Sequence, residues 1–318
     1  MFDGDFSSRV VAVDSGDVVA RPDGLIGAGW RDADTLAGGQ LTGDEVEIVR
    51  FDLDSDALVP EGGAIPLDEA LTIEATELDT GKDHFILRYR VEADNWLTRF
   101  DSDTLRPGPR IPVEGIVSWA ISRTGHRIAA GTTSGIHVYD AFTGEEVGAI
   151  PDPNLRGVFI TVTDQLFVSS LGGELTQYDL DTLEPIRAFG GSRGHVFSAA
   201  GTADGSLLAT SGGDQRVYLY DIASGVRIGT PISVPDGQWN HINISLDGKW
   251  LTVGGERPEN LVRGQDTFQI WDLDPEHWAT AACRVAGRNL TRAEWADNIG
   301  ELAPYQATCP DLPLDTED

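Results

Sequence analysis

Cysteine and lysine are both scarce in this chain of 318 residues. The only cysteines are Cys283 and Cys309, so no pair of Cys-x-x-Cys motifs exists for a structural zinc site. Lys82 and Lys249 are the only lysines, and the 23 basic residues face 52 acidic ones. The resulting net charge of −29 would repel a polyanion in most orientations, so we expect no nucleic-acid partner.

Long apolar runs are also absent. No run approaches the length needed to cross a bilayer. The first ten residues, MFDGDFSSRV, lack a basic segment followed by an apolar core. We therefore expect a soluble chain without a membrane partner.

Motifs that carry catalytic chemistry are missing as well. The sequence contains no Gly-x-x-x-x-Gly-Lys-Ser/Thr phosphate loop, no Gly-x-Ser-x-Gly and no His-Glu-x-x-His. Acidic turns recur, for example at Asp101-x-Asp103 and Asp179-x-Asp181, and one at Asp52-x-Asp54-x-Asp56 lacks the glycine and glutamate of a calcium loop. We predict that these carboxylates close turns on the backbone. The chain is predicted to have no catalytic residue, metal or cofactor.

One stretch, residues 194–232, predicts its own secondary structure without reference to the rest of the chain. It holds four short β-prone runs, at residues 196–200, 207–210, 217–220 and 226–232. Asp204-Gly205 between the first two favours a two-residue hairpin, whose central positions both take positive φ. A four-stranded antiparallel meander cannot bury both faces alone, so units of this length stack radially as propeller blades.

The same stretch resembles a WD repeat, which opens on Gly-His and closes on Trp-Asp. Here the matching pairs are Gly194-His195 and Tyr220-Asp221. The resemblance implies a buried hydrogen-bond relay through four residues, which are His195, Thr210, Asp214 and Tyr220. It also implies an all-β propeller that supplies a binding surface.

An aromatic-Asp pair recurs along the chain in steps close to 40 residues, with two longer steps attributed to loop insertions. The spacing of these pairs predicts a propeller of seven blades, one of them incomplete. A propeller of six blades is the alternative. The N-terminal piece has room for two strands only, at residues 9–13 and 17–21. We predict that they pair with the terminal blade and so close the ring.

After Asp274 the period becomes helical. Asp274 is suited to cap a helix that begins at Pro275 and ends at Gly287, and Thr291 with Glu294 forms a capping box for a second helix. We therefore divide the chain into a propeller at residues 1–274 and a helical cap and tail at residues 275–318. The helical hairpin is expected to pack on the propeller rim.

The tail resembles the ending of WD-repeat sensor regions in large actinobacterial signalling ATPases of the STAND type. The residues that carry the resemblance are Cys283, residues 287–291, Glu294-Trp295 and Cys309-Pro310. The resemblance implies a sensor role beside an ATPase. Because this chain lacks a phosphate loop, that ATPase would lie upstream in a longer polypeptide or be absent.

Cys283 and Cys309 are candidates for a disulfide. The bridge would add roughly 3 kcal/mol of stability by limiting the unfolded chain. A cytoplasmic location, which we otherwise expect, would keep both thiols reduced. The alternatives are therefore a cytoplasmic protein with free thiols and an extracytoplasmic protein with a bridge.

Four residues are candidates for binding a protein partner. Trp239, Asn240 and His241 begin an inner strand near the mouth, and Arg193 shares the mouth side. The alternatives are that Trp239 packs between blades and that Arg193 screens its acidic neighbours. We predict a non-enzymatic protein-interaction or sensor module, and the rival is a lactonase-like hydrolase with a metal in the central channel.

Overall fold

The computed structural model describes residues 10–11, 18–20, 25–30, 35–42, 45–52, 57–66, 71–72, 84–91, 94–101, 104, 106–234, 239–245, 247–256, 267–300 and 303–314. These residues form five four-stranded sheets, one three-stranded sheet and one two-stranded sheet. All of the pairings are antiparallel between strands that follow one another in the chain, as a repeated meander requires.

The four-stranded sheets take up residues 25–233. Their strands are β3 (Leu25–Trp30), β4 (Thr35–Thr42), β5 (Glu45–Asp52) and β6 (Ala57–Pro66); β7 (Leu71–Thr72), β8 (His84–Val91), β9 (Asp94–Asp101) and β10 (Ile111–Pro112); β11 (Ile116–Ile121), β12 (Arg127–Thr132), β13 (Ile136–Asp140) and β14 (Glu146–Ile150); β15 (Leu155–Ile160), β16 (Leu166–Ser170), β17 (Leu175–Tyr178) and β18 (Pro185–Phe189); and β19 (Val196–Gly201), β20 (Leu207–Gly212), β21 (Arg216–Asp221) and β22 (Arg227–Ser233). The three-stranded sheet contains β23 (Trp239–Ile244), β24 (Trp250–Glu256) and β25 (Thr267–Asp272).

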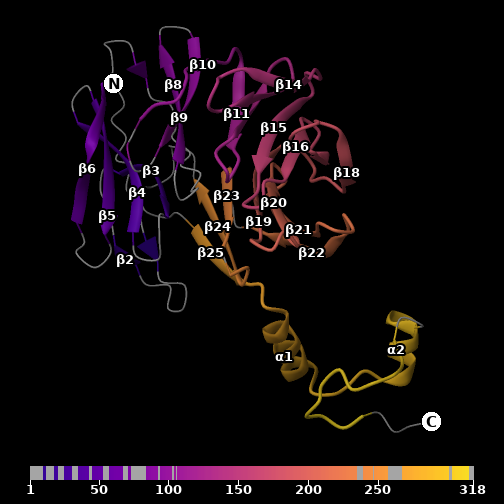
Figure 1. Cartoon of the computed structure of the whole chain (residues 1–318). Helices are drawn as coiled ribbons and strands as arrows, with labels where there is room; N and C mark the ends of the chain where they lie inside the picture. Colours follow the sequence, from indigo (N-terminus) through magenta and orange to yellow (C-terminus); the bar gives the residue numbers. More distant parts are fainter. Residues whose placement is uncertain are drawn as a thin grey trace.

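The sheets follow one another around a common centre, from indigo through magenta to orange (Figure 1). Among the described side chains, neighbouring sheets from β7 to β25 pack face to face, and each of these interfaces has its own apolar cluster. Val138 of one sheet and Val168 of the next, for example, share a cluster, and both are almost fully buried. The core is thus a series of layers between sheets, because each sheet alone is too thin to bury its faces.

The turn at Asp204-Gly205 differs from the predicted two-residue hairpin. Only Gly205 takes a positive φ, of 70°, and its N–H donates to the Thr202 carbonyl at 3.0 Å. The Thr202 hydroxyl accepts from the Leu207 N–H at 3.0 Å and lies 2.5 Å from the Asp204 carboxylate. Because the hydroxyl and the carboxylate satisfy the loop's backbone groups, a longer loop replaces the tight turn.

The N-terminal strands also depart from their prediction. β1 (Val10–Val11) and β2 (Val18–Ala20) pair with each other as a separate sheet. Within the described residues, β25 pairs with β24 alone, so closure by shared strands was a wrong prediction. Strands of two and three residues offer few backbone groups for a second ladder.

Both helices begin where the sequence predicts, and α1 also ends there. Asp274 caps α1 (Pro275–Ala286) by accepting from the Glu276 N–H, and Gly287 ends it at φ 65°. Thr291 caps α2 (Arg292–Asn298), and Glu294 completes the capping box with the Thr291 N–H.

The expected packing of these helices on the sheets is absent. α1 and α2 stand apart from the sheets (Figure 1), and α1 buries none of its residues. Trp278 remains 41% exposed and Val285 85% exposed. Instead, Trp295 is buried against Tyr305 at a ring distance of 5.6 Å, so the apolar residues of α2 pack within the tail itself.

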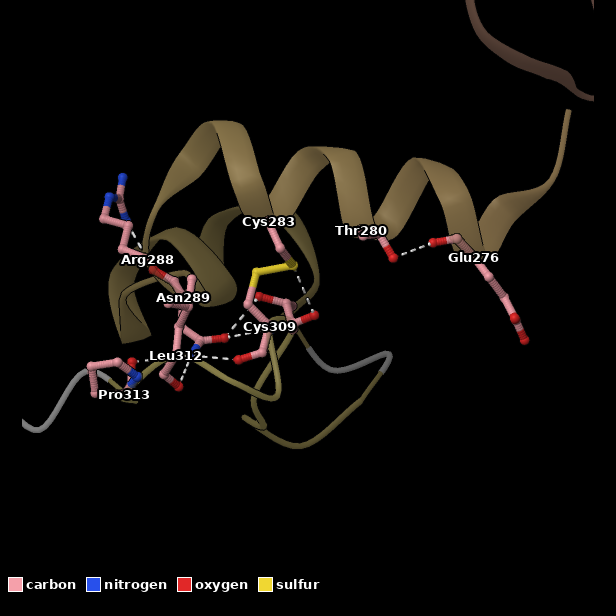
Figure 2. Close-up of a disulfide and its surroundings, with 9 residues drawn as sticks. Glu276, Thr280, Cys283, Arg288, Asn289, Cys309, Leu312 and Pro313 are labelled. Carbon is pink, nitrogen blue, oxygen red and sulfur yellow. Dashed lines mark hydrogen bonds between the residues drawn. A yellow bond between two sulfur atoms is a disulfide. The ribbon is translucent and has the colours of Figure 1, made fainter. Parts of the chain in front are cut away.

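A disulfide joins Cys283 of α1 to Cys309 (Figure 2). Beside it, the Asn289 side chain contacts the backbone around Cys309 and Leu312. The described part of the tail is therefore fastened mainly to itself.

Candidate binding site at the centre of the sheets

A hollow of about 230 Å³ lies where the inner strands converge. Its walls come from β11, β15, β19 and β23 and from His195, just before β19. Most of the wall is apolar or aromatic, and its largest side chains are Trp119, Phe159 and Phe197. Among the described residues, no Asp, Glu, Lys or Arg belongs to this lining. Such a surface favours an uncharged ligand group or side chain.

Serine hydroxyls join the inner strands of neighbouring sheets beside this hollow. The Ser118 hydroxyl of β11 donates to the Arg156 carbonyl at 2.5 Å and accepts from the Val158 N–H at 3.1 Å. Ser198 of β19 accepts in the same way from the Ile242 N–H at 3.2 Å. From sequence, Ser118 and Ser198 appear only as small channel-side residues. Because both are the third residue of an inner strand, this recurrence is the sequence feature that could have predicted their bonds to the next inner strand.

His195 lies at the wall of the hollow, half-buried. Its ring packs edge-on against Phe197 at 5.3 Å, and its Nδ1 is buried without a hydrogen-bond partner. Burial lowers the pKa of His195, a hydrogen bond to the Ser170 backbone opposes the shift, and the Arg156 charge adds to it. The imidazole is thus held toward its neutral form.

The other members of the predicted relay have different partners. Asp214 accepts from the Tyr218 hydroxyl at 2.5 Å and from the Arg193 N–H at 3.1 Å. Tyr220 donates to the Gly190 carbonyl of the preceding sheet and hydrogen-bonds with Thr210, while burial raises its pKa to about 12.

The four-membered relay stays a prediction: among its residues, Thr210 and Tyr220 bond each other, and Asp214 bonds Tyr218. Tyr218 and Tyr220 lie on one face of β21, with stacked rings 6.4 Å apart. Tyr218 is nearer to the turn that holds Asp214, so it takes the carboxylate. His195 instead bonds the Ser170 backbone, leaving Thr210 and Tyr220 as a pair.

Of the predicted partner-binding residues, the structure places His241 in the wall of this hollow. His241 lines the hollow and is exposed. Arg193 is exposed, with its backbone fixed by Asp214. The side chains of Trp239 and Asn240 lie outside the described residues. The structure thus brings His241 and His195 to the same hollow. Arg193 precedes His195 by two positions in the sequence.

The acidic turns hold their own backbone, as predicted. Asp179 accepts from the Asp181 and Thr182 N–H groups at 3.1 and 2.8 Å, and the Thr182 bond is the main cause of its lowered pKa. Asp101 accepts from the Thr104 N–H at 2.8 Å. Asp54, Asp56 and Asp103 lie outside the described residues. These turns are closed by hydrogen bonds rather than assembled as ligand sets.

Within the described ranges, no three His, Cys, Asp or Glu side chains come together as a metal-holding group. The helices in the same ranges are too short and polar to span a membrane.

Two of the solved structures that share this architecture serve for comparison. One is the β-propeller domain of Cps50 (Swd1) from Myceliophteria thermophila, with a TM-score of 0.60 and 14% identity over 85% of this chain and 91% of that one. The other is a chain of the mitotic checkpoint complex, with a TM-score of 0.59 and 16% identity over 87% of this chain and 85% of that one. The fold is a WD-repeat β-propeller. No family model and no curated protein sequence matches the chain.

Proposed function

We propose that this propeller is a non-enzymatic protein-interaction or sensor module whose partner docks at the mouth of the central hollow. The observation that carries the proposal is the exposed His241 in the wall of an aromatic hollow, together with the exposed Arg193 two residues before His195 of the same wall. Aromatic side chains and arginine are the residue types most enriched in interaction hot spots. One solved structure with this architecture belongs to a multi-protein complex.

The fold would contribute by holding the contact residues in place. The Arg193 N–H is fixed by Asp214, and the strand that carries His241 is tied to β19 through Ser198. A partner that binds such a surface orders few side chains on this protein, so less conformational entropy opposes the complex.

Affinity capture with matched variants tests this proposal. We would immobilise the full chain, the double variant Arg193→Glu/His241→Glu, and the control Ile186→Glu on the exposed outer strand β18, and quantify captured proteins by mass spectrometry. A partner retained by the control and lost from the mouth variant supports the proposal. If the mouth variant captures every protein that the wild type captures, the partner does not dock there.

The proposed sensor role leaves two alternatives for the cellular compartment, which differ in whether an ATPase lies upstream. The disulfide favours the extracytoplasmic alternative, because cytosolic reductants keep most thiols reduced. A sensor arm on an upstream ATPase would instead work in the cytosol. Alkylation of thiols in intact cells, followed by peptide mapping of Cys283 and Cys309, separates these two settings.

A further inference from the structure

Apolar side chains of three inner strands remain exposed to solvent in the wall of the central hollow. Val117 of β11 is 47% exposed, and Phe159 of β15 and Phe197 of β19 are only half-buried. Between the sheets, by contrast, Val138 and Val168 are almost fully buried. The hollow is therefore a place where side chains from separate strands leave a shared apolar surface in water.

Polar groups of the same wall are already bonded or open to water. The Ser118 hydroxyl bonds the Arg156 carbonyl and the Val158 N–H, and it cannot leave them without weakening the contact between blades. His241 is exposed, so water satisfies its ring without a ligand. The favourable contribution that the described wall offers a bound group is thus the burial of apolar surface.

Charge narrows the choice of that group. The described wall contains no Asp, Glu, Lys or Arg, so a carboxylate or an ammonium group would lose its water there without gaining an ion pair. The charge of Arg156 also reaches His195, which adds repulsion against a lysine or arginine side chain. The hollow therefore fits an uncharged, apolar group.

The volume of the hollow sets the size of the group. An apolar cavity of about 150 Å³ holds benzene, whereas sites for whole drug-sized molecules measure about 300–1,000 Å³. At about 230 Å³ the hollow has room for one aromatic ring and little else. Such a ring would pack against Phe159 and Phe197, and aromatic pairs add to the free energy of area burial.

The wall is held in place before anything binds. Ser118 joins β11 to β15, and Ser198 joins β19 to β23. Because these bonds fix the strands, a side chain that enters the hollow orders few groups of the propeller. A preformed pocket filled by one aromatic side chain is the arrangement typical of an interaction hot spot.

The geometry points to an aromatic anchor: one phenylalanine-sized side chain of the partner protein enters the central hollow and packs against Val117, Phe159 and Phe197. This inference rests on the proposed function, because it takes the partner to dock at the mouth of the hollow. It adds the chemistry of the contact, which is an apolar ring carried by a partner chain rather than a charged side chain or a free small molecule.

Titration of the full chain with capped amino acids tests the anchor without the partner. The probes are N-acetylphenylalanine amide, N-acetylalanine amide and the α-amide of N-acetylglutamic acid, and the readout is the methyl NMR signals of Val117 and Val147. Val147 is the matched control, since it is 45% exposed on the outer strand β14.

We expect the phenylalanine probe to shift the signals of Val117 and not those of Val147, and to bind at least tenfold more tightly than the other two probes. No shift of Val117 up to about 50 mM, or equal affinity for the three probes, would overturn the anchor. Binding of toluene without binding of the phenylalanine probe would also overturn it, because a free small molecule would then be the occupant.

Variants separate the anchor from the docking site itself. Val117→Asp places a charge in the hollow and should lose both the phenylalanine probe and the captured partner, whereas Val147→Asp should retain both. Val117→Trp fills the hollow with apolar atoms and should abolish probe binding even if Val117→Asp does not fold.

The two proposals fail in different ways. A partner that is retained by both Val117 variants but lost from Arg193→Glu/His241→Glu would overturn the anchor and leave docking at the mouth standing. Binding of the phenylalanine probe, with no partner captured by the wild type, would support the preference of the hollow for a ring and count against the docking proposal.

Discussion

Replacing Asn289 by alanine tests whether one side chain organises the C-terminal tail. Asn289 is 4% exposed, and its amide group faces the backbone of residues 308–313 (Figure 2). Its Nδ2 donates to the carbonyls of Cys309, Leu312 and Pro313 at 3.2, 2.7 and 3.0 Å. Its Oδ1 accepts from the Cys309 N–H at 2.7 Å and from the Thr308 hydroxyl at 3.2 Å.

The expected loss of free energy follows from the number of hydrogen bonds that the Asn289 amide can make at once. The amide nitrogen has two N–H groups for three carbonyls, so about four of the five contacts are independent hydrogen bonds. Each contributes about 1 kcal/mol net, and Asn289→Ala also leaves the buried Cys309 N–H without its acceptor. We expect the free energy of opening this segment to fall by about 3–4 kcal/mol.

Amide hydrogen exchange in the oxidised protein measures that free energy locally. The Leu312 N–H donates to the Cys309 carbonyl at 3.1 Å and reports opening of the segment without itself bonding Asn289. A loss of 3–4 kcal/mol corresponds to exchange about 10² to 10³ times faster. The control Asn298→Ala removes one exposed hydrogen bond, from Asn298 to the Glu294 carbonyl, and should change exchange less than threefold. If Asn289→Ala leaves the Leu312 rate unchanged, the disulfide alone holds the segment.

Three further changes probe other parts of the chain. Replacing both Cys283 and Cys309 by serine should lower the stability of the tail by about 3.5 kcal/mol, the loop-closure entropy expected for a sequence separation of 26 residues. The melting temperature of the propeller should not change. A lower propeller melting temperature would contradict the independence of the tail. Gly131→Ala should cost about 2 kcal/mol in urea unfolding, because its Cβ would collide with a carbonyl of the neighbouring blade; unchanged stability would contradict that contact. Hydrogen bonds from Arg288 lower the pKa of Glu294 to about 2, so the tail should lose stability as the pH falls from 4.5 toward 2. Tryptophan fluorescence should show a smaller loss of stability in Glu294→Gln than in the wild type. An equal acid response in both proteins would exclude Glu294 as the group that causes the loss.

The repeat and the helix ends could be predicted because local residues determine them. Asp274 and Gly287 cap α1 through contacts within a few residues, and the capping box of Thr291 and Glu294 is equally local. The order of the strands follows for the same reason, since each strand pairs with its neighbour in sequence. A pattern that repeats in sequence therefore specifies the blades without knowledge of distant contacts.

The errors arose where the choice of partner depends on distance in space. The sequence spacing relates Asp214 to Tyr220, but it cannot show that Tyr218 lies closer or that Gly190 takes the Tyr220 hydroxyl. In the same way, the amphipathic pattern of α1 predicts a buried face but does not say what covers it. Among the described residues, the predicted pairing of the N-terminal strands with the last sheet is absent, because it required a pairing between opposite ends of the chain.

The inner strands explain why the central hollow, and not the abundant acidic turns, is the place to seek ligand chemistry. Carboxylates such as Asp179 already hold backbone N–H groups, and the Ser118 and Ser198 hydroxyls already join neighbouring blades. Those groups cannot leave their partners without weakening the fold. His241 is different, because its side chain is exposed in the wall of the hollow, where a partner can reach it.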